Sequence, residues 1–75
     1  MPKLPVLPAR DILRALQRAG FEVVGQRGSH IKLRGDRGGV ARTVIVPNYD
    51  EVPRGVLVSI LRQAGLTRQE FLDLL

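Results

Sequence analysis

The side chains in this sequence that could carry out chemistry are concentrated in residues 25–34, GQRGSHIKLR. This stretch holds the only histidine of the chain, His30, together with Arg27, Lys32 and Arg34. An imidazole titrates near neutral pH, so His30 can accept and release a proton where other unperturbed side chains cannot. The cationic side chains around it can bind phosphate. The combination predicts proton transfer on a substrate that contains phosphate.

RNA fits this combination because it carries its own nucleophile, the ribose 2′-hydroxyl. A histidine that removes the hydroxyl proton lets the oxygen attack the adjacent phosphorus, and Lys or Arg can stabilise the developing charge without a metal ion. These residues are compatible with metal-independent RNA cleavage, with His30 as general base or acid and with Lys32 and Arg34 on the phosphate. A lone histidine is also compatible with an ordinary surface position, so a non-catalytic RNA-binding module is the alternative.

Two small residues, Gly28 and Ser29, directly precede His30. A glycine allows positive φ or close approach of a phosphate, and a serine hydroxyl can bond to one. The same pair also suits an ordinary turn between strands. Arg27 and Lys3 are expected close enough to contact the same RNA. The predicted RNA-binding residues are thus Gly28, Ser29, Lys32, Arg34, Arg27 and Lys3.

Other kinds of chemistry find little support in the sequence. There is no cysteine and only one histidine, so neither a thiolate nor a multi-histidine metal site can form. The glycine-rich stretch GDRGG lacks the Gly-Lys-Ser/Thr ending of a phosphate-binding loop. No cofactor is predicted.

Length and charge limit the class of protein. The 75 residues make a single domain, residues 1–75, with a net charge of +5. Residues 1–42 hold nine Lys/Arg and three Asp/Glu, whereas residues 43–75 hold three and four. This uneven distribution favours a polyanionic partner, of which nucleic acid is the common one. No stretch is long enough to cross a membrane or to serve as a secretion signal, so a soluble cytoplasmic protein is expected.

Helical and strand periodicities alternate along the chain. The first helix carries apolar residues at helical spacing and Arg10, Arg14 and Arg18 on another face, which suits either solvent or a nucleic-acid backbone. A TRQE capping box introduces a short last helix. The expected elements are a helix over 7–20, strands over 21–27 and 29–34, a loop over 35–39, a strand over 40–47, a helix from about Pro53 to Gly65, and a helix after 67–70.

Short connections between the strands predict an antiparallel sheet with helices on one face, an α+β fold. Within the second strand, Ile31 and Leu33 alternate with His30, Lys32 and Arg34. A period of two places the apolar pair against the helices and the other three on the uncovered face. The predicted catalytic histidine therefore stands on an open sheet surface.

Three segments, RAGFEVVGQRGSHIKL, RTVIVPNY and RGVLVSILRQAGLTRQEFLDLL, share an order and spacing with a known family. Through them the chain closely resembles the HicA family of bacterial mRNA-interferase toxins over about residues 8–75. The resemblance implies a fold like the double-stranded RNA-binding domain, translation-independent mRNA cleavage, and an essential histidine that corresponds to His30. It also implies a HicB-like antitoxin that covers the active face, usually encoded beside the toxin in a bacterial operon.

The sequence departs from the family pattern at Tyr49, where many members have a second histidine. If one imidazole takes the proton, the group that protonates the leaving 5′-oxygen is His30 itself, Tyr49, Lys32 or water. A role mainly as a protein partner, with no RNA affinity, is a third possibility that the basic charge allows. The free toxin is expected to be a monomer.

Overall fold

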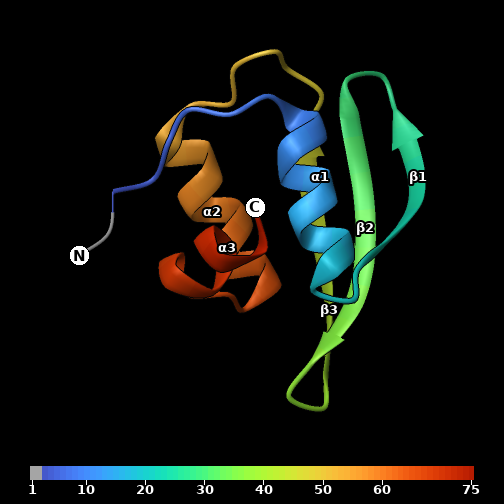
Figure 1. Cartoon of the computed structure of the whole chain (residues 1–75). Helices are drawn as coiled ribbons and strands as arrows, with labels where there is room; N and C mark the ends of the chain where they lie inside the picture. The colour runs from blue at the N-terminus through green and yellow to red at the C-terminus, as the bar shows by residue number, and fades with distance from the viewer. Residues whose placement is uncertain (1–2) are drawn as a thin grey trace.

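In the computed structural model, which describes residues 3–75, two helices pack on one face of a three-stranded sheet and a short third helix packs against them (Figure 1). The sheet is antiparallel, with its strands in the order β1-β2-β3. This confirms the predicted α+β fold, with the helix–sheet–helix order of a double-stranded-RNA-binding domain and an added last helix. The elements are α1 (Ala9–Arg18), β1 (Glu22–Arg27), β2 (His30–Arg37), β3 (Val40–Pro47), α2 (Arg54–Ala64) and α3 (Arg68–Leu74).

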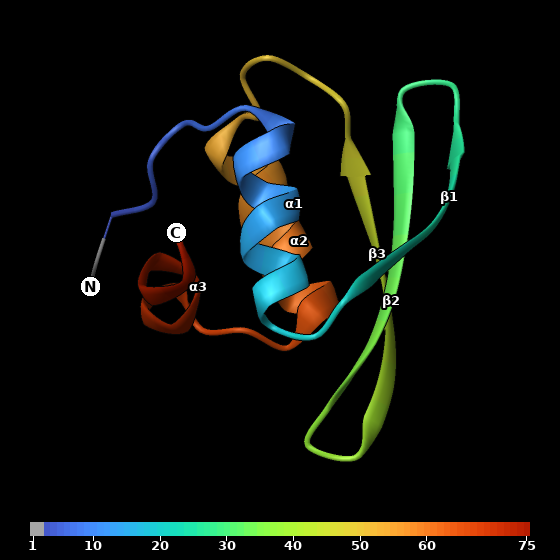
Figure 2. The ribbon, with the colours of Figure 1, turned by 45° about the vertical axis from the view of Figure 1, so that its right-hand side comes forward.

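All three helices lie on the same side of the sheet, and the opposite side is uncovered (Figure 2). The alternation in β2 decides which residues meet the helices, because Ile31 and Leu33 are buried while His30, Lys32 and Arg34 are exposed. Burial of each such aliphatic side chain stabilises the fold by about 1.5–3 kcal/mol. The other core residues include Ile12 and Leu16 of α1, Val44 and Val46 of β3, Leu57, Ile60 and Leu61 of α2, and Phe21 and Phe71.

The helix ends follow the expected chemistry. Pro8 and Pro53 each precede the first residue of a helix, and Gly65 ends α2 with a φ of 71°, in the left-handed region. The predicted capping box is present, since the Glu70 backbone nitrogen donates to Thr67 Oγ1 and the Thr67 nitrogen donates to Glu70 Oε1. Local sequence therefore sets where the helices begin and end.

The expected loop over residues 35–39 is wrong in extent. Strand β2 continues to Arg37, and β3 begins at Val40, so the turn consists of Gly38 and Gly39 alone. Both glycines have positive φ, 61° and 81°, as a two-residue type I′ hairpin requires. Near this turn, Arg37 Nη2 lies 2.6 Å from Glu70 Oε2, an ion pair that joins β2 to α3.

Strand β1 is the most exposed element of the sheet. All six of its residues are exposed, whereas β2 and β3 each bury several. Figure 1 shows the reason, because β1 lies at the edge of the sheet beyond the helices. Strand β1 therefore projects from the packed body, and both of its faces are accessible.

Candidate active site

His30 stands at one end of the sheet, where all three strands meet. It is the first residue of β2 and is paired with Arg27 of β1 and with Pro47 of β3. The turn before it contains Gly28, with a φ of 58°, followed by Ser29, the pattern of a type II′ hairpin turn. The backbone nitrogen of Asn48 donates to the Ser29 carbonyl at 2.6 Å, which fixes the turn to the end of β3. The imidazole is thus held on a defined backbone while its ring remains exposed.

An irregularity in β1 determines which of its side chains share the face of His30. Pairing runs Val23 with Leu33 and then Gly25 with Lys32, so Val24 is an extra residue in β1. Directly paired residues point to the same side of a sheet. Without the extra residue, period two would send Arg27 to the helix side; with it, Arg27 joins His30 on the uncovered side.

We call this uncovered side of the sheet the open face. Its rows of paired residues are Arg27–His30–Pro47, then Gly25–Lys32–Ile45, then Glu22–Arg34–Thr43. The row that holds His30 is followed by a row in which β1 contributes a glycine. Because Gly25 has no side chain, the open face is hollowed between its neighbours.

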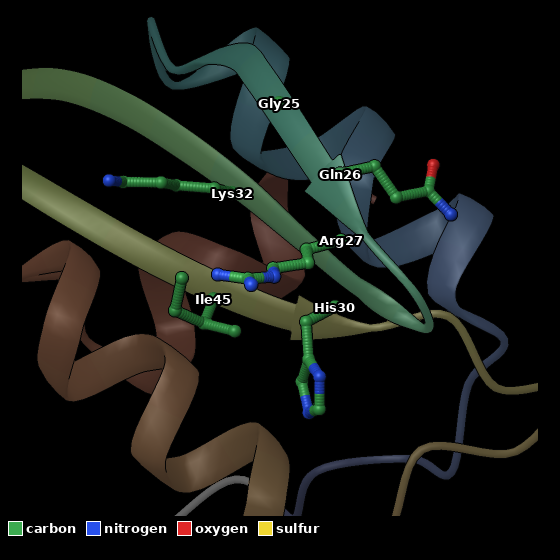
Figure 3. A pocket seen from close by; sticks show the side chains of 6 residues that line it. All are labelled: Gly25, Gln26, Arg27, His30, Lys32 and Ile45. Carbon is green, nitrogen blue, oxygen red and sulfur yellow. The ribbon is translucent and has the colours of Figure 1, made fainter.

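The first hollow has a volume of about 510 Å³. Figure 3 shows the side chains around it, with Arg27 lying over the region between Lys32 and His30, and Gln26 directed away. The Gln26 side chain instead donates to the Gly28 carbonyl at 3.1 Å. The hollow is lined by Gly25, Gln26, Arg27, His30, Lys32 and Ile45.

A second hollow of about 270 Å³ lies on the other side of His30, toward α2. This hollow lies between β3 and α2, which are joined by a hydrogen bond: the Ile45 backbone nitrogen donates to Gln63 Oε1 at 2.8 Å. That bond holds α2 along the free edge of β3. The lining includes His30, Ile45, Pro47, Tyr49, Ser59 and Gln63.

The structure brings together only some of the residues that the sequence singled out. Arg27, His30 and Lys32 line the first hollow, and Arg34 lies further along the open face beside Glu22 and Thr43. Gly28 and Ser29 lie in the turn rather than in either hollow.

Lys3 is not brought to this group. Its neighbour Leu4 is buried, and the Leu4 carbonyl accepts a hydrogen bond of 2.6 Å from Nε of Arg54, the first residue of α2. The N-terminal segment lies on the side of α2 that faces away from the β1–β2 hairpin (Figures 1 and 2). The expected proximity of Lys3 to His30 is wrong because tertiary contacts, which the sequence does not reveal, decide where this segment packs.

Sequence reasoning also missed Ser59 and Gln63 on the second hollow. No signal in the sequence distinguishes them, because they are polar residues on a helix whose other face is buried. Only the docking of α2 beside β3 places them near His30.

Comparison with known protein families decides the classification. The model of the family described as HicA toxin of bacterial toxin–antitoxin systems matches residues 9–66. The chain belongs to the HicA toxin family. Membership makes it the toxin of a toxin–antitoxin pair and implies a cognate antitoxin. No curated protein matches the chain significantly.

The matched part of this HicA toxin includes the sheet, both hollows and helices α1 and α2. Helix α3 lies beyond it, and α3 supports the fold from outside the site through Phe71 and the Glu70–Arg37 pair. Across residues 3–75 of the HicA chain, no three His, Cys, Asp or Glu side chains gather as metal ligands would. The same residues contain no helix long and apolar enough to span a membrane.

The arginine stripe on α1 of this HicA toxin is not a free basic edge. Arg14 lies 3.8 Å from Asp11, and Arg18 donates to the Leu74 carbonyl at 2.8 Å. Both contacts lie in the helical layer, on the side of the sheet opposite the open face. Two of the three arginines are therefore engaged within the protein, which weakens their case as a nucleic-acid-tracking surface.

Proposed function

We propose that this HicA toxin is a metal-independent endoribonuclease that cleaves mRNA, with His30 as its general base or acid. The observation that carries the proposal is the position of His30 on the open face, exposed and flanked by Arg27 and Lys32. Family membership supports the same reading, since HicA toxins are in general RNases. A flexible RNA strand can reach this imidazole without any movement of the helices.

The proposed reaction begins when a ring nitrogen of His30 takes the proton of a ribose 2′-hydroxyl. The oxygen attacks the adjacent phosphorus, and the bond from phosphorus to the 5′-oxygen of the next nucleotide breaks. The products are a 2′,3′-cyclic phosphate and a 5′-hydroxyl, which receives a proton as it leaves. Lys32 and Arg27 stabilise the negative charge that develops on the phosphate oxygens. Arg34 binds RNA further along the same face.

The leaving oxygen needs a proton donor. His30 can return the proton that it has taken, and Lys32, Tyr49 and water are the other candidates near it. Tyr49 lines the second hollow together with His30, and Lys32 lines the first. A single positioned acid or base accelerates such a step by about 10²–10⁴-fold.

The antitoxin partner is proposed to be HicB-like and to cover the open face. The toxin carries a net charge of +5, and Arg27, Lys32 and Arg34 lie together on that face. An acidic surface on the antitoxin would therefore be attracted to the same residues that bind RNA. The free toxin is proposed to be a monomer in the bacterial cytoplasm.

The test is cleavage of single-stranded RNA in the presence of a chelator by the wild type and by His30→Ala. Because His30 is exposed, the substitution should leave the thermal unfolding unchanged while it removes cleavage. RNA binding should persist, and growth inhibition on induction should disappear. Gln17→Ala, at an exposed position of α1 on the helix side of the sheet, is the matched control and should still cleave.

The alternative is a non-catalytic RNA-binding module. It predicts that the folded wild type binds RNA and leaves it intact, and that His30→Ala changes nothing. An alanine variant that cleaved RNA as fast as the wild type would remove His30 from the mechanism.

A further inference from the structure

Two hollows flank His30 on the open face, and they share two residues. His30 and Ile45 line both the hollow of about 510 Å³ beside β1 and the hollow of about 270 Å³ beside α2. The two side chains therefore form a divide between the hollows. A ligand that contacts His30 at its centre can extend into either side.

The geometry of RNA cleavage is compatible with such an arrangement around the histidine. The attacking 2′-hydroxyl belongs to the nucleotide on the 5′ side of the phosphate, and the leaving oxygen belongs to the nucleotide on the 3′ side. His30 must lie within about 2.6–3.2 Å of the hydroxyl. The phosphodiester then lies over the divide, and its two nucleosides diverge from it.

We infer that each hollow receives one of the two bases that flank the cleaved bond. The site is thus built for one dinucleotide step of single-stranded RNA, an inference that rests on the proposed function. A base inside a regular duplex is stacked and paired and cannot enter a hollow, whereas an unpaired base can be splayed out.

The first hollow suits a flat group because Gly25 leaves space on the sheet. A Cβ built on Gly25 meets no atom within 4 Å, and its φ is not positive, so a larger residue fits without backbone strain. Ile45 offers an apolar surface there, and the Arg27 guanidinium offers a plane on which a base can stack. Lys32 is placed to meet phosphate at the border.

The second hollow offers an aromatic ring. Tyr49 is 46 % exposed although it follows a strand whose end is buried, and it lines this hollow with Pro47. A Tyr ring is a stacking surface for any base, and such stacking contributes roughly 1–3 kcal/mol per base. Ser59 and Gln63 supply polar groups on the α2 side. The two hollows therefore differ in chemistry while each can hold a base.

The experiment uses short single-stranded RNAs with one cleaved bond, in which the base on the 5′ side or the 3′ side is omitted and the ribose is kept. In the wild type, each omission should slow cleavage by roughly 5- to 150-fold. Gly25→Val places a branched side chain on the floor of the first hollow, where it prevents a base from lying flat on the sheet. Tyr49→Ala removes the aromatic ring from the second hollow. In each variant, omission of the base that would occupy the altered hollow should slow cleavage by about twofold or less, because the variant has already lost the contribution of that base. Omission of the other base should slow cleavage as much as it does in the wild type.

The decisive result is that the two variants become insensitive to omissions on opposite sides of the bond. Tyr49→Phe, which keeps the ring, should show the wild-type ratio of cleavage rates between complete and base-omitted RNA, whatever loss of the hydroxyl does to the rate on the complete RNA. Ala41→Val, at a strand position opposite Asp36 toward the far end of the sheet, is the control for added bulk. Unfolding curves of all variants verify that they are folded.

Two failures are distinguishable. A wild type that leaves the complete RNA intact overturns the proposed function and this inference together. A wild type that cleaves, with both variants insensitive on the same side or on neither side, overturns the inference of two base sites and leaves the proposed function standing.

Discussion

The cationic side chains of the helix side and those of the open face differ in what they contact. On the helix side, Arg18 and Arg54 donate to backbone carbonyls, and Arg14 and Arg37 pair with carboxylates.

On the open face, Arg27, Lys32 and Arg34 make no side-chain hydrogen bond or ion pair with any other residue in 3–75. The positive charge of these four helix-side arginines is used to hold the fold. The charge of the open face is left for a ligand.

The two sides of the sheet also differ in burial, and the difference is largest between adjacent residues of β2. Substitutions at these two positions should therefore differ most in their effect on the free energy of unfolding. Leu33→Ala should lower the free energy of unfolding by about 2–5 kcal/mol, because Leu33 is fully buried. Arg34→Ala should change it by less than about 0.5 kcal/mol, since its side chain is exposed and unpaired. Urea denaturation measures both. Similar losses in the two variants would show that the open face is not independent of the core.

The same contrast predicts unequal effects on RNA binding for equal changes of charge. In a His30→Ala background, which prevents cleavage, Lys32→Gln should weaken binding of single-stranded RNA and reduce the slope of log affinity against log salt by about 0.7. Arg14→Gln removes the same charge from the helix side and should leave the slope nearly unchanged. Fluorescence anisotropy between 50 and 200 mM salt, a range in which such slopes are steep, makes the comparison. Equal slopes for the two variants would contradict the placement of RNA on the open face.

The smallest predicted effect is on the pH dependence of stability, and it involves Glu70 on the helix side of the sheet. Hydrogen bonds from the Thr67 backbone, from Arg37 and from the Thr67 hydroxyl lower the pKa of Glu70 below its ordinary value of 4.5. The charged form is therefore favoured by folding, and its contribution is fully present above about pH 4.5 and is lost as the pH falls below that value.

Glu70→Gln should accordingly reduce the dependence of thermal unfolding on pH in the acid range, by a small amount because both side chains of the pair are partly exposed to solvent. Cleavage at neutral pH should not change. A Glu70→Gln variant with the same acid dependence as the wild type would assign that dependence to other carboxylates.

Much of the fold could be predicted because local chemistry determines it. Alternation in β2 separates Leu33 from Lys32, and the capping box at Thr67 marks the start of α3. The one clear error in the elements, the loop at 35–39, came from treating its glycines as a loop. A Gly-Gly pair between two strands is a signal for a two-residue hairpin.

The site was harder to predict because it depends on pairing and docking. His30 and Lys32 were found through a period of two. Arg27 was placed by proximity in sequence, although its face is decided by the extra residue Val24, which no local pattern marks. Lys3 was misplaced, and Ser59 and Gln63 were missed, because where the N-terminal segment and α2 pack is decided by tertiary contacts.

The central claim, that His30 activates a ribose hydroxyl, is tested most directly by removing that hydroxyl. A short single-stranded RNA with one 2′-deoxynucleotide on the 5′ side of the cleaved bond should resist the wild-type toxin at that bond. The unmodified RNA should yield a 2′,3′-cyclic phosphate and a 5′-hydroxyl. Cleavage of the deoxy-substituted bond at the same rate, or products with a 5′-phosphate, would contradict the account.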